Sequence, residues 1–79
     1  MARTFASPRH AALVEFLRKK RKKADLTQAQ VAKRLGRYQS YVTDYERGQK
    51  RIDAVELVHI AEVIGFDPIE AVRLIKRTK

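Results

Sequence analysis

The 79-residue chain has no cysteine and no tryptophan, and it contains only three glycines and two prolines. Without cysteine it can form neither a disulfide framework nor a thiolate zinc site, and two isolated histidines cannot build a metal site alone. No apolar run approaches the ~20 residues that span a bilayer, and the N-terminus lacks the apolar core of a signal peptide. The sequence therefore predicts a cytoplasmic protein that enters no membrane and carries no metal or cofactor.

The length of the chain sets a second limit. A chain of this size buries only about 60% of the surface of its unfolded state, so its core must be compact. It is too short to enclose a nucleophile with its base, or paired carboxylates in a pocket, so we expect neither an enzyme nor a small-molecule substrate. We expect one domain over residues 7–79, preceded by a flexible arm over residues 1–6.

Positive charge is in excess. Lysine and arginine number 18 against 9 acidic residues, which gives a net charge of +9 and a pI of about 10.4. Such a balance is typical of proteins that bind polyanions, although it also serves solubility. The basic run Arg18–Lys23 has three interpretations: a solvated helix end, where cations meet the negative end of the helix dipole, or a patch that faces phosphates. A nuclear localisation signal also fits its composition, but nothing else in the sequence indicates one.

The prolines and glycines mark helix boundaries. Ser7 precedes a proline that fits the first position of a helix, and Asp67 precedes the second proline in the same way. Thr27 and Asp53 are each followed three residues later by glutamine or glutamate, the spacing of a capping box. Predicted helices begin at Pro8, Gln28, Gln39, Ala54 and Pro68, and glycines end three of them, at Gly36, Gly48 and Gly65. The segment after Asp53 is apolar nearly all round, which predicts the central core helix of an all-α fold.

The segment Gln39–Arg47 carries two unlike faces. Val42 and Tyr45 share one face, while the remaining side chains are short, polar and dense in hydrogen-bonding groups. A helix of this diameter fits the major groove of DNA, where groups that donate and accept can distinguish base pairs by their edges. The candidate base-reading residues are Gln39, Ser40, Thr43 and Asp44.

The stretch from Leu26 to Gly48 resembles a known pattern. It is similar to the helix-turn-helix signature of the lambda-repressor-like family, also called the XRE type. The residues that carry the resemblance are Leu26, Thr27, Gln28, Val31, Ala32, Leu35, Gly36, Ser40, Val42, Tyr45, Glu46 and Gly48. The resemblance implies a compact five-helix DNA-binding domain in which helices 2 and 3 form the helix-turn-helix.

The resemblance also implies roles for single residues. Gln28 should hold a phosphate at the N-terminus of its helix, and Arg21 should form a partly buried structural ion pair with Glu46. From their charge or reach, further candidate phosphate ligands are Arg37, Tyr41, Arg47, Lys50 and Arg51. Two positions depart from the family pattern. Asp25 replaces a common glycine and must adopt a left-handed or other helix end, and Tyr38 is a poor N-cap for the helix that follows it.

The last helix exposes more apolar surface than docking requires. In the family this region often forms the dimer contact, so Ile69, Val72 and Ile75 are candidate dimer residues, with packing inside one chain as the alternative. Together these features predict a sequence-specific, double-stranded-DNA-binding transcriptional regulator that is a homodimer. Repression and activation both fit, and we predict a repressor. The alternative is an antitoxin-like or protein-interaction module of the same fold whose DNA binding is secondary.

Overall fold

A computed structural model of the chain describes residues 7–79, and this range contains five helices and no strand. The all-α prediction is therefore confirmed. The arm predicted for residues 1–6 lies outside the described residues. The helices are α1 (Pro8–Lys23), α2 (Gln28–Leu35), α3 (Gln39–Glu46), α4 (Ala54–Ile64) and α5 (Pro68–Arg77). Within residues 7–79, none of them combines the length and the apolar content needed to cross a membrane.

The predicted capping interactions set where the helices begin. The Thr27 hydroxyl accepts from the backbone N–H of Gln30 at 3.1 Å, and the Gln30 side chain accepts from the backbone N–H of Thr27 at 2.8 Å. Asp53 and Glu56 form the same reciprocal pair at the start of α4. These bonds satisfy backbone donors that would otherwise lack a partner in the first helical turn. The starts of both helices are therefore fixed by local sequence.

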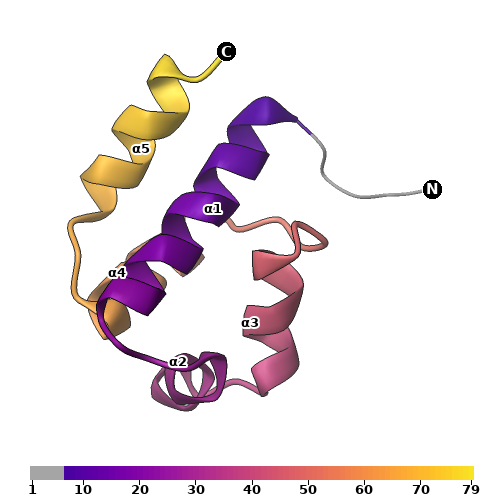
Figure 1. Cartoon of the computed structure of the whole chain (residues 1–79), viewed down its shortest axis with the longest axis vertical. Coiled ribbons are helices and arrows are strands. Elements are labelled where there is room, and N and C mark those ends of the chain that lie inside the picture. Colours follow the sequence, from indigo (N-terminus) through magenta and orange to yellow (C-terminus); the bar gives the residue numbers. More distant parts are fainter. Residues whose placement is uncertain (1–6) are drawn as a thin grey trace.

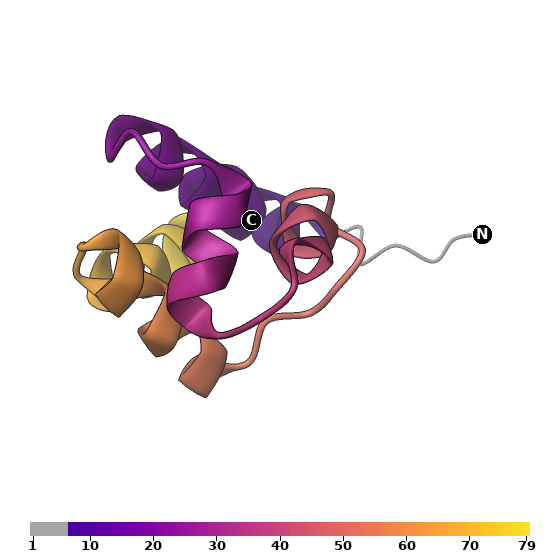
Figure 2. The ribbon, with the colours of Figure 1, turned by 90° about the horizontal axis from the view of Figure 1, so that it is seen from below.

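The helix α1 packs against both α5 and α3, and α2 packs against α3 and α4. In Figure 1, α1 and α5 lie side by side with opposite chain directions. Arg9 Nε donates to the Thr78 carbonyl at 2.8 Å near one end of this pair, and Lys20 Nζ lies 3.0 Å from the Glu70 carboxylate near the other. Seen from below in Figure 2, α2 lies between α3 and α4.

One core joins all five helices. Its largest fully buried side chains are Leu17, Val31, Val42, Tyr45 and Ile60. The prediction for α4 was partly wrong, because this helix is not buried all round. Leu57 and Ile60 enter the core, but the exposed fractions of Val55 and Val58 are 64% and 41%. The main contacts of α4 are with α2 and α5, and the exposed Val55 and Val58 lie largely outside them.

Candidate nucleic-acid interface

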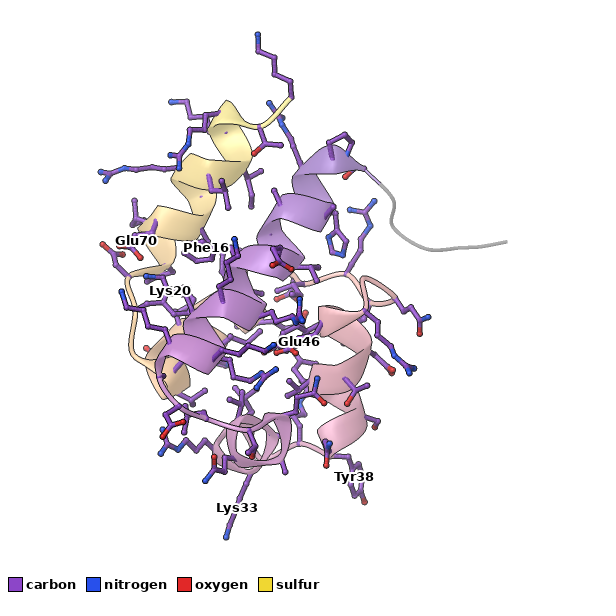
Figure 3. All side chains as sticks on the ribbon, viewed as in Figure 1. Phe16, Lys20, Lys33, Tyr38, Glu46 and Glu70 are labelled. Carbon is purple, nitrogen blue, oxygen red and sulfur yellow. The ribbon has the colours of Figure 1, made fainter. Side chains whose placement is uncertain are left out.

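The α2–turn–α3 unit presents the N-terminus of α3 to solvent. Gly36 ends α2 in the left-handed region (φ 71°), and the chain then reaches α3 within two residues. Tyr38 is the N-cap of α3, but its side chain makes no capping hydrogen bond, as the sequence predicted. Its exposed fraction is 89%, and Figure 3 shows its ring pointing away from the helices. The first turn of α3 is therefore held by the backbone and by packing further along the helix.

Two buried residues fix the orientation of α3. Val42 and Tyr45 are completely buried against the other helices. Gln39 and Ser40 are exposed at the start of the helix, and Thr43 is half-buried. Since residues three and four apart share a helix face, Thr43 continues the face begun by these two polar residues. Asp44, the fourth candidate reader, is also half-buried.

The ion pair expected between α1 and α3 is present. Arg21 Nε donates to Glu46 Oε2 at 2.6 Å and its NH2 group donates to Glu46 Oε1 at 2.9 Å, so the contact has two parallel bonds. A third bond joins Arg21 NH1 to the Leu26 carbonyl at 2.9 Å. The hydrogen bonds that it donates to Glu46 raise the pKa of the Arg21 guanidinium above its ordinary value. Figure 3 shows Glu46 between α1 and α3, where the pair locks the end of α3 to the first helix.

Gln28 connects this ion pair to Thr43. Gln28 Nε2 donates to Glu46 Oε1 at 2.9 Å, and the Thr43 hydroxyl donates to Gln28 Oε1 at 2.9 Å. This link could not be predicted from the sequence, because the three residues come from two helices whose relative position only the fold defines. An amide nitrogen has two hydrogens, and the bond to Glu46 uses one of them. The second hydrogen, which this bond does not use, is the one that the predicted phosphate contact of Gln28 would need.

A hollow of about 350 Å³ lies beside the start of α2. Its lining residues include Lys22, Gln28 and Gln39 but also Asp25, so positive charge and amide donors lie beside one carboxylate. It adjoins the N-terminus of α2, where backbone N–H groups and the helix dipole favour an anion. The surroundings of Gln28 thus suit a phosphate oxygen.

Cations flank α3 at both ends. Arg37 precedes the helix, and Arg47, Lys50 and Arg51 follow it. The Arg37 guanidinium lies 4.4 Å and the Lys50 ammonium 5.3 Å from the centre of the Tyr41 ring, so this ring carries both as cation–π contacts. Lys50 Nζ is also 3.7 Å from Glu56 Oε2. These contacts hold two long basic side chains next to the exposed face of α3.

Tyr41 itself is placed differently from its predicted role. Burial raises the pKa of its hydroxyl to about 12, and the neighbouring Glu56 carboxylate contributes in the same direction. A hydroxyl that already faces one anion is poorly placed to bind a phosphate as well. Tyr41 therefore serves as the support for Arg37 and Lys50, a use that the sequence did not indicate.

Arg47 and Arg51 are exposed, as phosphate ligands would need to be. Arg47 is the C-cap of α3, and Arg51 lies in the loop before α4. Burial lowers the pKa of His10, and the positive charge of Arg51 lowers it further. Arg51 therefore lies close to the start of α1, on the side of the molecule where α1 and the loop after α3 meet.

The predicted dimer residues divide into two groups. Ile69 and Val72 on α5 have exposed fractions of 49% and 48%. Ile75 instead packs, partly buried, against the core, which is the packing inside one chain that the sequence left as the alternative. It lies on the side of α5 that docks on the rest of the chain. Val55 and Val58 on α4 add exposed apolar surface, in contrast to the core position that their sequence predicts.

Comparison with known proteins agrees with this geometry. The family model described as "Helix-turn-helix domain" matches residues 12–74. An XRE-family like protein from Pseudomonas syringae pv. tomato has a solved structure with 35% identity and a TM-score of 0.81; the match covers 86% of this chain and 83% of that one. The restriction-modification controller protein C.AhdI from Aeromonas hydrophila has 29% identity and a TM-score of 0.73, covering 78% and 94%.

A third structure, the clp gene regulator ClgR from C. glutamicum, has a TM-score of 0.78 over 86% of this chain and 88% of that one. At 20% identity it shows the fold alone. The comparison with curated protein sequences found no match. The fold and the exposed polar helix define a helix-turn-helix protein. Within that class, the chain belongs to the XRE-type, lambda-repressor-like family, as its sequence predicted.

Proposed function

We propose that this protein is a sequence-specific transcriptional regulator, and a repressor, that reads the major groove of double-stranded DNA with α3. One observation carries the proposal: the polar N-terminal face of α3 is exposed while its opposite face is buried and its end is tied to α1 through Glu46. A helix held this rigidly can present side chains to base edges in a fixed orientation. The net charge of +9 supplies the attraction for phosphates.

The side chains divide into readers and phosphate ligands. The proposed readers of base edges are Gln39, Ser40, Thr43 and Asp44. The proposed phosphate ligands are Gln28, Arg37, Arg47, Lys50 and Arg51, which surround the exposed face of α3. Phosphate contacts fix the register of the protein on DNA, and base contacts give the sequence preference.

Selection of bound duplexes from a random pool at physiological salt tests the reading function. We expect enrichment of a defined consensus, because four polar side chains on one rigid helix cannot satisfy all base edges equally. Recovery of an unenriched pool would refute sequence-specific reading. For repression, a reporter promoter that carries the consensus over its start site should lose activity when the protein is expressed, and a gain in activity would refute that role.

Salt dependence tests the phosphate ligands separately. Lys50→Gln should weaken binding to all sequences alike and reduce the slope of log K against log salt by about one. Lys76→Gln is the matched control, since it removes the same charge from α5, which α1 separates from α3 in Figure 1. Equal slopes for the wild type and the Lys50 variant would exclude a phosphate contact by Lys50.

We also propose a homodimer that uses the exposed apolar surface of Ile69 and Val72, extended by Val55 and Val58. Two copies would place their α3 helices about one turn of DNA apart, roughly 34 Å, and would select a palindromic site. Sedimentation velocity should show a dimer for the wild type and a shift toward monomer for Val72→Lys. A wild-type monomer both with and without DNA would rule out this assembly.

A further inference from the structure

The hydrogen-bond chain from Arg21 to Thr43 has a fixed polarity. A guanidinium group can only donate hydrogen bonds, so both carboxylate oxygens of Glu46 accept from Arg21, at 2.6 and 2.9 Å. The carboxylate has no hydrogen, so the group of Gln28 that contacts it must be the amide NH2. If the Gln28 amide were reversed, its oxygen would face the Glu46 oxygen at 2.9 Å with no hydrogen between them.

The orientation of Gln28 then determines that of Thr43. With its NH2 group on Glu46, Gln28 presents its carbonyl oxygen to α3, and this oxygen can only accept. The Thr43 hydroxyl has one hydrogen and donates it to Gln28 at 2.9 Å. Thr43 Oγ1 then has only lone pairs left, so it can only accept a hydrogen bond from a base. A threonine hydroxyl can ordinarily rotate to donate or accept, and here that freedom is removed.

In the major groove, hydrogen-bond donors occur on only two bases: the N6 amino group of adenine and the N4 amino group of cytosine. The corresponding edge positions of guanine and thymine are the keto oxygens O6 and O4, which only accept. An obligate acceptor on α3 is matched by an amino group and opposed by a keto oxygen.

We propose that Arg21, Glu46 and Gln28 fix Thr43 as a hydrogen-bond acceptor, so that Thr43 selects an amino base, adenine or cytosine, over a keto base at one position of the bound strand. The inference rests on the proposed DNA-binding function and deepens it. Thr43 is the residue that touches the base, while Gln28 and Glu46 act through it as positioning residues. This predicts a degenerate position in the consensus, with A and C on one strand and T and G opposite.

Selection from a random duplex pool, repeated with variants, tests the proposal. For the wild type we expect A and C to be favoured over G and T at one position by roughly three- to tenfold, the range of one net hydrogen bond. Thr43→Ser keeps the hydroxyl and should keep this preference. Thr43→Val has nearly the same shape but no hydroxyl, and should lose the preference there while the rest of the consensus persists. An unchanged consensus for Thr43→Val would overturn the proposal.

Two variants test the polarity rather than the contact. Gln28→Met removes the fixed acceptor, so Thr43 can rotate to donate or accept, and both amino and keto bases should be tolerated at that position. Glu46→Gln replaces one of the two carboxylate oxygens with an NH2 group, so the atom that faces Gln28 no longer has to be an acceptor. Gln28 can then turn either its oxygen or its NH2 group toward Thr43, and the amino preference at that position should weaken. A merely structural role for Gln28 would lower affinity without altering this base preference.

The outcomes separate the two claims. If the wild type enriches a consensus but Gln28→Met keeps the same amino preference, the polarity argument is wrong and DNA reading stands. If the wild type enriches nothing, the proposed function fails and this inference with it. Circular dichroism of each variant at the selection temperature checks folding. Should Glu46→Gln unfold, the Thr43 and Gln28 variants still decide the matter, because neither removes the Arg21–Glu46 ion pair.

Discussion

Replacing Glu46 with alanine would leave the Arg21 guanidinium without a counter-charge in a nearly closed site. The exposed fractions of the two side chains are 10% for Arg21 and 4% for Glu46. Arg21 would lose two charge-assisted hydrogen bonds and keep the bond to the Leu26 carbonyl, and Gln28 would lose its acceptor. Breaking a buried pair by removing one partner costs about 3–5 kcal/mol.

The remaining Leu26 bond favours the lower end of that range, about 3 kcal/mol. For a domain of this size each kcal/mol lowers the melting temperature by roughly 4–8 °C, so Glu46→Ala should lower it by roughly 12–24 °C. Urea unfolding followed by far-ultraviolet circular dichroism gives the free energy directly, provided that the slope with denaturant is unchanged.

The matched control is Glu15→Ala. Glu15 also pairs with an arginine, Arg18, at 3.2 Å, but the two side chains are 50% and 45% exposed. A surface pair of this kind contributes between zero and about 1 kcal/mol. If Glu46→Ala were no less stable than Glu15→Ala, the Arg21–Glu46 pair would not stabilise the packing of α3 on α1 as its geometry indicates. The double variant Arg21→Met with Glu46→Leu should recover much of the lost stability, because apolar side chains tolerate the site without a counter-charge.

Three further predictions concern stability and pH. Asp25 adopts a left-handed conformation (φ 61°), so Asp25→Gly should raise the free energy of unfolding by roughly 0.5–1 kcal/mol, and a loss measured in urea would contradict this. Thr27→Ala removes the α2 cap and should cost about 1 kcal/mol in the same assay; a cost near zero would show that the capping box adds nothing. The pKa of Tyr41 is raised to about 12 against about 10 in an unfolded chain, so its contribution to stability is complete below pH 10 and is lost as pH rises toward 12. Tyr41→Phe should lack that part of the alkaline decline, and identical pH–stability curves would refute the assignment.

Local signals in the sequence were sufficient for the helix boundaries. The capping pairs at Thr27 and Asp53, the left-handed Gly36 and the uncapped Tyr38 each depend on residues within four positions of one another. Such interactions do not depend on how the rest of the chain folds, and they could therefore be predicted. The ion pair of Arg21 with Glu46 spans 25 positions and was accessible only through the family resemblance.

Burial and hydrogen-bond polarity could not be predicted in the same way. Val55 and Ile75 look alike in sequence, but the first is exposed and the second packs against the core, since the outcome depends on which helix lies opposite. The use of Tyr41 as a support for Arg37 and Lys50 requires three segments to meet. The hydrogen bond between Gln28 and Thr43 likewise forms only when α2 and α3 pack against each other.

The helix α1 lies between the proposed dimer surface and the reading helix. Arg9 and Lys20 bind it to α5, and Arg21 binds it to α3. The relative position of the proposed dimer surface and the reading helix therefore depends on α1. Because α5 runs alongside α1, the separation across α1 is its width, about 10–12 Å with side chains. In a symmetric dimer, the packing of α5 and α3 on α1 would contribute to the distance between the two reading helices. Changes in its buried face would then alter which operator spacings are accepted, without touching a single base contact.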